Sequence, residues 1–90
     1  MIDIIWDSGF RSSYRKRVRQ NERLRSEFRE AVVAFAENPF NPVLQTHRLT
    51  GRLAGLWAFS VDDDCRVVFA FINEGTAALL MDIGTHSEVY

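Results

Sequence analysis

The chain has 90 residues and a formal net charge of −1, with 47% apolar residues that include seven Phe and two Trp. This length corresponds to one domain, residues 1–90, with one hydrophobic core. The single cysteine, Cys65, excludes an intramolecular disulfide. The chain has no apolar run of about 18 residues and does not begin with a basic-then-apolar leader, so we expect a cytoplasmic protein that does not contact a membrane.

Charge is unevenly distributed along the chain. Residues 10–29 carry eight basic and two acidic side chains, whereas residues 60–90 carry one basic and six acidic side chains. Ten of the eleven basic residues are Arg, whose planar guanidinium suits phosphate and carboxylate groups. We expect the basic segment to meet an RNA backbone, with Arg15 and Arg19 as contacts, or an acidic partner. The alternative is a solvated helix surface.

A strand and two helices are predicted for the first half of the chain. Residues 2–6 are rich in strand formers, and Asp7 or Ser8 can cap the helix that follows. An apolar residue at every fourth position predicts a helix at roughly 9–19. A longer apolar stripe after Asn21 predicts a second helix at about 22–37, which ends where Asn38 precedes a proline. The two helices would form an antiparallel hairpin that covers one face of a sheet.

Three strands are predicted for the second half, at residues 56–61, 66–72 and 77–83, with turns at 62–64 and 73–76. The middle run is almost continuously apolar, as expected of a central strand. Trp57 and Phe59 are expected in the core, and Cys65 is expected to pack between strands. The predicted class is α+β, in the order β-α-α-β-β-β, with the helical hairpin packed on a small, mostly antiparallel four-stranded sheet.

Two histidines and one strand arginine are the first candidates for chemistry. His47 and His86 lie beside predicted strands, and a sheet can bring them together as an acid and a base, because histidine titrates near neutral pH. Arg66 begins an otherwise apolar strand and can stabilise phosphate charge in a transition state. The alternatives are exposed polar histidines in a loop and a turn, and a salt bridge from Arg66 to one of the three preceding aspartates.

Two further side chains and a metal site are additional candidates for chemistry. Asp64 can orient a histidine or take a proton itself, or it can simply form the turn. Tyr90 can stack on a base or donate its hydroxyl, or its ring can pack on the sheet. Two histidines and one cysteine can in principle bind zinc, but their spacing matches no familiar ligand pattern, so we expect no metal and no cofactor.

Four segments resemble, in their order and spacing, the RelE/ParE toxin superfamily of bacterial toxin–antitoxin modules. The nearest pattern is that of its YafQ-like RelE/StbE branch. No single segment is decisive, but together they span essentially the whole chain. They are Glu37–Pro42 (ENPFNP), His47–Trp57 (HRLTGRLAGLW), Asp64–Phe69 (DCRVVF) and Asp82–Tyr90 (DIGTHSEVY).

The resemblance implies a fold, an activity and partners. The fold is a four-stranded antiparallel sheet with a helical hairpin on one side. The activity is that of a toxin of a type II module, an endoribonuclease that cuts mRNA in the ribosomal A site beside 16S rRNA. The RNA 2′-hydroxyl attacks the adjacent phosphate, so neither metal nor cofactor is implied. A cognate antitoxin protein is the expected partner.

Five catalytic positions follow from the resemblance. His47 and Asp64 match acid–base positions of the YafQ-like pattern, and His86 matches its C-terminal catalytic histidine. Tyr90 matches the terminal aromatic position. Arg66 matches the strand arginine with which RelE-type toxins hold phosphate. Which histidine is the base and which the acid stays open, because such pairs titrate as a unit.

The resemblance also indicates RNA contacts and one departure. Arg48 and Arg52 lie in a segment that resembles the RNA-contacting loop. Ser60 stands where YafQ-like toxins often carry a further histidine, and a hydroxyl is no comparable acid or base, although Arg66 can compensate. Two other functions remain open: a ParE-like inhibitor of DNA gyrase on the same fold, and a weakly active protein that mainly binds its antitoxin. A gyrase inhibitor does not need the proposed catalytic set.

Overall fold

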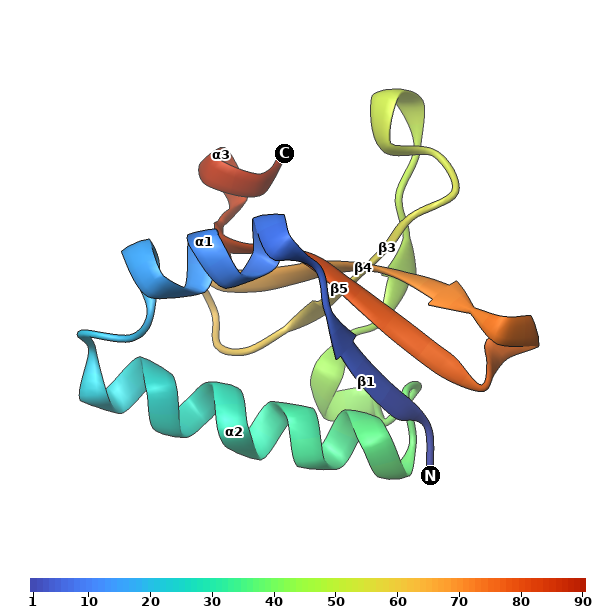
Figure 1. Cartoon of the computed structure of the whole chain (residues 1–90), viewed down its shortest axis with the longest axis horizontal. Helices are drawn as coiled ribbons and strands as arrows, with labels where there is room; N and C mark the ends of the chain where they lie inside the picture. The colour runs from blue at the N-terminus through green and yellow to red at the C-terminus, as the bar shows by residue number, and fades with distance from the viewer.

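A five-stranded mixed sheet organises the chain in the computed structural model, which describes residues 1–90 (Figure 1). The strand order is β1-β5-β4-β3-β2; β1 runs parallel to β5, and all other pairs are antiparallel. The strands are β1 (Asp3–Trp6), β2 (His47–Arg48), β3 (Trp57–Ser60), β4 (Cys65–Ile72) and β5 (Ala77–Thr85). The helices are α1 (Ser8–Arg17), α2 (Glu22–Glu37) and α3 (His86–Val89). Short 3₁₀ turns lie at η1 (Pro42–Leu44), η2 (Gly51–Leu53) and η3 (Asn73–Gly75).

The predicted α+β class and the helical hairpin on a sheet are confirmed, but the prediction of four strands is wrong. The fifth strand is β2, whose two residues pair with β3 as His47↔Ala58 and Arg48↔Trp57. Two residues are too few to show a period of two, so this strand leaves no recognisable pattern in the sequence. The C-terminal helix α3 was likewise not predicted, because four residues carry no helical period.

Side-chain caps fix where the two long helices begin. The Asp7 carboxylate accepts from the Gly9 N–H at 2.9 Å, and the Asn21 side chain accepts from the Leu24 N–H at 3.0 Å. Each cap satisfies an N–H that has no partner inside its helix, which contributes on the order of 1 kcal/mol. Both predicted capping positions are therefore confirmed, and α2 has the predicted bounds.

The core lies between α2 and the sheet. Phe35 of α2 stacks on Phe59 with ring centroids 4.6 Å apart and meets Phe69 edge-to-face at 4.8 Å. Phe59 and Cys65 are buried, as predicted, whereas Trp57 is half-buried and packs against the edge of the core. A second aromatic cluster joins β1, α1 and α2; its members are Trp6, Phe10, Tyr14 and Phe28.

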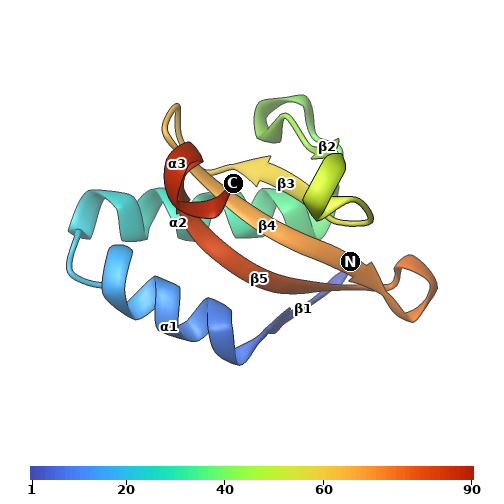
Figure 2. The same cartoon turned by 90° about the horizontal axis from the view of Figure 1, so that it is seen from above.

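The two faces of the sheet are covered unequally. The long helix α2 runs beneath the sheet, α1 lies beside β5, and α3 and the loop with η2 stand above the sheet (Figures 1 and 2). Because successive strand residues point to opposite faces, the burial of Cys65, Val67 and Phe69 in the α2-side core directs Arg66 to the other face. We call that other face the upper face. None of the helices combines the length and apolar composition required to cross a membrane.

Candidate functional site

The upper face brings His47 and Arg66 to the same side of the sheet. Ser60, Arg66 and Gly84 form one cross-strand row, and His47, Ala58 and Val68 form the next row. The two rows are two residues apart along β3 and β4 and therefore share a face, so His47 and Arg66 project from the same surface. From strand spacing and rise, their Cα atoms are about 12 Å apart. Side chains of this length can reach one phosphodiester placed between them.

Arg66 keeps an uncompensated positive charge. Its Nη1 group donates to the carbonyl oxygens of Asp62 and Asp63, at 2.9 and 3.1 Å, and makes a longer contact of 3.4 Å with that of Cys65. No carboxylate lies within 4 Å of it, so the structure does not contain the salt bridge to a preceding aspartate that was the alternative interpretation of Arg66. The guanidinium therefore rests on the β3–β4 turn, and its other nitrogens remain available to an anion.

The three aspartates before Arg66 have different roles. Asp62 builds the turn, because its Oδ1 accepts from the N–H groups of Asp64 and Cys65 at 2.8 and 2.7 Å. Burial raises the pKa of Asp62, but these hydrogen bonds and those with Glu27 and Arg23 outweigh it and leave the pKa below its ordinary value. The Asp64 carboxylate is exposed, accepts no hydrogen bond and forms no ion pair. The Asp64 carboxylate, two residues before Arg66, thus has no partner within the chain.

Helix α3 presents His86 and Tyr90 together. Thr85 and Glu88 form a capping box: the Thr85 N–H donates to Glu88 Oε1 at 2.7 Å, and the Glu88 N–H donates to Thr85 Oγ1 at 3.3 Å. A spacing of four residues places His86 and Tyr90 on one side of the helix. Their rings meet edge-to-face with centroids 4.6 Å apart. This box, which the sequence analysis did not identify, is a recognisable local signal in Thr-His-Ser-Glu.

Tyr90 connects α3 to the loop above the sheet. Its hydroxyl oxygen is buried and makes no hydrogen bond within the chain. Burial raises the pKa of Tyr90, while the positive charge of Arg66 acts in the opposite direction. Arg52 donates from Nη2 to the main-chain oxygen of Tyr90 at 2.6 Å. Beside this contact lies the Tyr90 hollow, of about 320 Å³, which is lined by Leu49, Thr50, Arg52, Leu53 and Tyr90.

Gln45 and Ser60 set the orientation of His47. The His47 Nδ1 lies 3.0 Å from the Gln45 carbonyl oxygen. A carbonyl only accepts, so Nδ1 carries the proton in the neutral ring and Nε2 keeps its lone pair. The Ser60 hydroxyl donates to the Gln45 side chain at 3.2 Å, and Gln45 itself has a positive φ of 51°. Ser60 therefore supports the segment that holds His47, a role that nothing in the sequence indicated.

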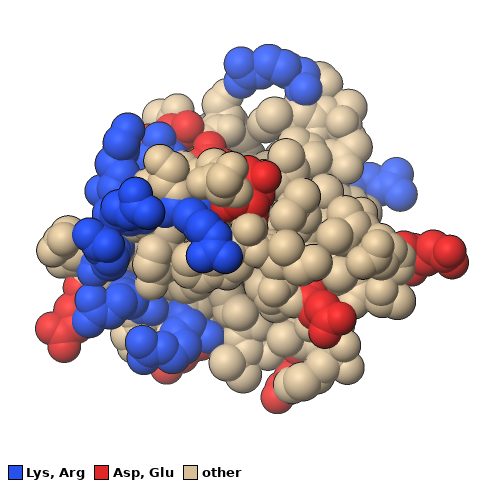
Figure 3. Space-filling model, in the orientation of Figure 1, with Lys and Arg blue, Asp and Glu red and all other residues tan.

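The predicted RNA-contacting arginines lie on separate surfaces. Arg52 borders the Tyr90 hollow, but Arg48 lies on the α2 side of the sheet, with its guanidinium carbon 5.2 Å from the centroid of the Trp57 ring. Arg15 and Arg19 are exposed and form no ion pair. In Figure 3, basic side chains gather at the end of the molecule formed by α1 and the start of α2, beside α3. The basic segment is therefore a continuous rim next to α3.

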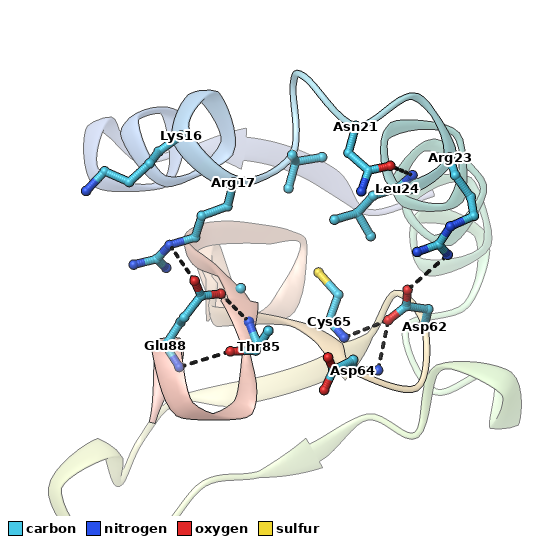
Figure 4. Close-up of a pocket in the computed structure, with 12 residues that line it drawn as sticks. Lys16, Arg17, Asn21, Arg23, Leu24, Asp62, Asp64, Cys65, Thr85 and Glu88 are labelled. Carbon is cyan, nitrogen blue, oxygen red and sulfur yellow. Dashed lines mark hydrogen bonds and ion pairs between the residues drawn. The ribbon is translucent and has the colours of Figure 1, made fainter.

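A second hollow separates the ends of the two long helices from the β3–β4 turn. This interhelical hollow has a volume of about 670 Å³ and Cys65 in its lining (Figure 4). Burial raises the pKa of the Cys65 thiol to about 12. Two ion pairs border the hollow: Arg17 with Glu88 on one side, at an N–O distance of 3.6 Å, and Arg23 with Asp62 on the other, at 3.5 Å. Asp64 lines this hollow and is absent from the lining of the Tyr90 hollow.

The side chains do not form a metal centre. No group of three or more His, Cys, Asp or Glu residues is arranged to hold a metal ion. Cys65 is only 4% exposed and belongs to the core, whereas His47 and His86 are exposed. The zinc alternative considered from residue types therefore has no geometric support.

Several solved structures with a similar fold are bacterial toxins. A metal-bound toxin from Helicobacter pylori matches with a TM-score of 0.79 at 23% identity, with 100% of both chains covered. A YoeB/ParE toxin from Agrobacterium tumefaciens matches with a TM-score of 0.78 at 18% identity, over 94% of this chain and 99% of that one. The chain has the RelE/ParE toxin fold. YafQ in the DinJ–YafQ complex from E. coli shares this RelE/ParE fold, with a TM-score of 0.77 at 14% identity over 100% and 99% of the two chains.

The RelE/ParE fold expected from the resemblance is thus confirmed. No protein-family model and no curated protein sequence matches the chain. With identities below 25%, structural likeness extends to the fold, and the activity has to be argued from the side chains described above.

Proposed function

We propose that this protein is the toxin of a type II toxin–antitoxin module and that it acts as a ribosome-dependent mRNA endoribonuclease. One observation carries the proposal: the uncompensated Arg66, the buried Tyr90 hydroxyl without a hydrogen bond, and both histidines border the upper face. A phosphodiester there would meet a cation, a hydrogen-bond donor and two imidazoles, which can act as acid and base. The toxins that share the fold support the toxin part of this proposal.

The proposed reaction uses only the RNA and protein side chains. The 2′-hydroxyl oxygen attacks the adjacent phosphorus, and the bond from phosphorus to the 5′ oxygen breaks as the new bond forms. The products are a 2′,3′-cyclic phosphate and a 5′-hydroxyl. A base removes the proton of the 2′-hydroxyl, and an acid protonates the leaving 5′ oxygen, so no co-reactant is consumed.

Each side chain has a role that its surroundings support. Arg66 neutralises the charge that develops on the phosphate, and the Tyr90 hydroxyl donates to a phosphate oxygen. His47 is the proposed base, because its hydrogen bond to Gln45 leaves the Nε2 lone pair available. His86 is the proposed acid. Asp64 remains an acid–base candidate, since its carboxylate has no other partner.

Partners follow from the same proposal. The basic rim at α1, with Arg15 and Arg19, would contact the phosphate backbone of mRNA or 16S rRNA, and Arg52 would bind RNA at the Tyr90 hollow. Arg48, on the opposite face, would contact RNA that passes the β2 edge of the sheet. An antitoxin protein is the expected neutralising partner, and the DinJ–YafQ complex supports this expectation.

Primer extension on a reporter mRNA tests the function. Wild type, His86→Ala and Ser87→Ala are each expressed briefly in a bacterial host. Ser87 is an exposed neighbour in α3 and controls for the effect of alanine on the helix. We expect in-frame cuts with wild type and Ser87→Ala, and none with His86→Ala.

Other outcomes would overturn specific parts of the proposal. Growth arrest without cuts would exclude the nuclease and favour a gyrase-type target. The absence of both arrest and cuts would leave a protein that mainly binds an antitoxin. Cutting by His86→Ala at the wild-type level would remove His86 from the catalytic set.

A comparison of Arg66→Ala with Arg66→Lys tests the phosphate role. Loss of a donor to a developing charge lowers kcat by about 10²–10³-fold, and Arg66→Ala is expected to do so with little change in ribosome binding. Arg66→Lys keeps the charge and should retain more activity. Equal losses of binding and cleavage in Arg66→Ala would reduce Arg66 to a simple phosphate contact.

A further inference from the structure

Helix α3 begins at His86 and is followed directly by Tyr90, two of the proposed site residues, but it is too short to be stable by itself. It has four residues, and an isolated helix shorter than about 12 residues is unstable in water. Its location above the sheet therefore depends on contacts with the rest of the chain. Val89 supplies a buried apolar contact, and Arg52 binds the main-chain oxygen of Tyr90. The remaining polar attachment comes from α1.

That attachment is the guanidinium of Arg17. Its Nη1 donates to the carbonyl oxygen of Ile83 at 3.0 Å and lies 3.3 Å from Asp82 Oδ1, while its Nε faces Glu88 Oε2 at 3.6 Å. Ser13, one turn earlier in α1, also donates to Asp82 Oδ1, at 2.7 Å. The Arg17 side chain is 25% exposed, so this group is partly withdrawn from water. One side chain thus joins α1, β5 and α3 (Figure 4).

Glu88 receives this contact while it caps its own helix. One carboxylate oxygen, Oε1, accepts from the Thr85 N–H, and the other, Oε2, faces Arg17. The hydrogen bond from the Thr85 N–H is the largest influence and lowers the pKa of Glu88; burial raises this pKa, and the charge of Arg17 lowers it to a smaller extent. The carboxylate is therefore ionised at neutral pH and links the start of α3 to α1.

Gly84 makes the approach of these groups possible. A Cβ atom at position 84 would lie 2.7 Å from Glu88 Oε1, 2.9 Å from Arg17 Nη1 and 3.0 Å from Glu88 Cβ. Gly84 has no positive φ, so the requirement for glycine at this position is space rather than backbone conformation. The neighbouring residue in the row across the sheet is Arg66. The attachment of α3 is therefore built directly beside the proposed phosphate-binding residue.

We propose that Arg17 is a positioning residue, which holds α3 against β5 through Asp82, Ile83 and Glu88 and so keeps His86 and Tyr90 beside Arg66. Arg17 lies in the basic segment that was expected to bind RNA or an acidic partner, yet its charge is used inside the fold. The link to catalysis rests on the proposed function; the mechanical role of Arg17 does not.

Amide hydrogen exchange tests the mechanical role directly. The Tyr90 N–H donates to the His86 carbonyl, and the Glu88 N–H to Thr85 Oγ1, so both report opening of α3. In Arg17→Gln, both amides should exchange about tenfold faster, the order expected for loss of a hydrogen bond from a charged group. In Glu88→Gln, where the side-chain oxygen can still accept from the Thr85 N–H and only the ion pair with Arg17 is lost, the increase should be about two- to fivefold. Arg29→Gln removes the same charge from an exposed α2 position without polar contacts and should change neither amide.

The variants separate a local effect from a general loss of stability. Glu88→Gln leaves the contacts of Arg17 with Asp82 and Ile83 intact, so exchange in β4 should stay at the wild-type rate while α3 exchanges faster. In cleavage assays, Arg17→Gln should lower kcat with little change in KM, and Arg17→Lys should recover part of the loss because it keeps the charge.

Two outcomes would decide against the proposal or its link to catalysis. Unchanged α3 exchange in both Arg17→Gln and Glu88→Gln would overturn the positioning role, whatever the protein does to RNA. If α3 exchanged faster in the variants but wild type cut no RNA, the positioning role of Arg17 would stand and the proposed function would be rejected.

Discussion

Replacing Tyr90 by Phe removes one hydroxyl and leaves the ring in place. That hydroxyl is buried without a hydrogen bond, whereas the ring packs edge-to-face on His86 with centroids 4.6 Å apart. We therefore expect Tyr90→Phe to raise the stability of the protein and to lower its activity. Opposite signs would result because the hydroxyl is buried and unpaired in the isolated protein, and it would donate only after a shift of the Tyr90 side chain exposes it to a phosphate oxygen.

The magnitude follows from the cost of an unsatisfied buried group, which is about 1–3 kcal/mol. Tyr90 as a whole is half-buried, so the lower end applies and a gain of about 1 kcal/mol is expected. For a domain of this size, that gain raises Tm by roughly 4–8 °C if α3 unfolds together with the core. Loss of the donor should lower the rate of RNA cleavage by about 10²-fold.

The effect of pH on stability provides an independent check. Burial raises the pKa of Tyr90 in the folded protein above its ordinary value of about 10. Below pH 10, Tyr90 is neutral in both the folded and the unfolded chain and its ionisation does not affect stability. As pH rises from 10 through the folded pKa, the free energy of unfolding declines, because Tyr90 ionises first in the unfolded chain. The stability advantage of Tyr90→Phe should therefore increase above pH 10.

Urea denaturation monitored by tryptophan fluorescence measures the change in the free energy of unfolding. Tyr14→Phe is the matched control: the hydroxyl of Tyr14 is not among the buried groups without a partner, so its removal should change stability little. If Tyr90→Phe instead destabilised the protein by 1 kcal/mol or more, on the scale of a net favourable hydrogen bond, the hydroxyl would already be paired. The Tyr90 hydroxyl would then not be free to donate to a phosphate oxygen, and its proposed role would be refuted.

Three further predictions concern the core, the thiol and the acid end of the pH range. Phe35→Ala should lower the free energy of unfolding by about 3–5 kcal/mol in urea, and a loss below about 1.5 kcal/mol would mean that the Phe59 and Phe69 rings close the cavity. Cys65 should resist iodoacetamide at neutral pH; because its folded pKa is about 12, stability should fall as pH rises from about 9 to 12, and this fall should be smaller in Cys65→Ala, where only the contribution of Tyr90 is left. The folded pKa of Glu88 is lowered, so its contribution is present above its ordinary pKa of 4.5 and is lost as pH falls through the folded pKa. The amide signals of α3 should shift in that range in wild type but not in Glu88→Gln.

Local signals in the sequence determined most of the secondary structure. The apolar stripe, Asn21 and the residue before Pro39 set both ends of α2, and the same kind of reasoning found α1 and its Asp7 cap. Hydrophobic runs located β3, β4 and β5 within one or two residues. These features depend on residues close together in the chain, where periodicity and capping act, so they can be read without a structure.

Features that join distant segments were decided only by the tertiary structure. The two-residue strand β2 exists because β3 pairs with it, and α3 stays in place through Arg17, 71 positions before Glu88. The strand register sends His47 to the upper face and Arg48 to the opposite one, although the two are neighbours in sequence. The residue types available for chemistry can be read from the sequence, but the elements that carry His47 and His86 cannot, because β2 and α3 are too short to leave a periodic pattern. Only packing between elements decided that Arg66 keeps its charge unpaired and that the Tyr90 hydroxyl is buried, because desolvation and register depend on contacts that no local pattern records.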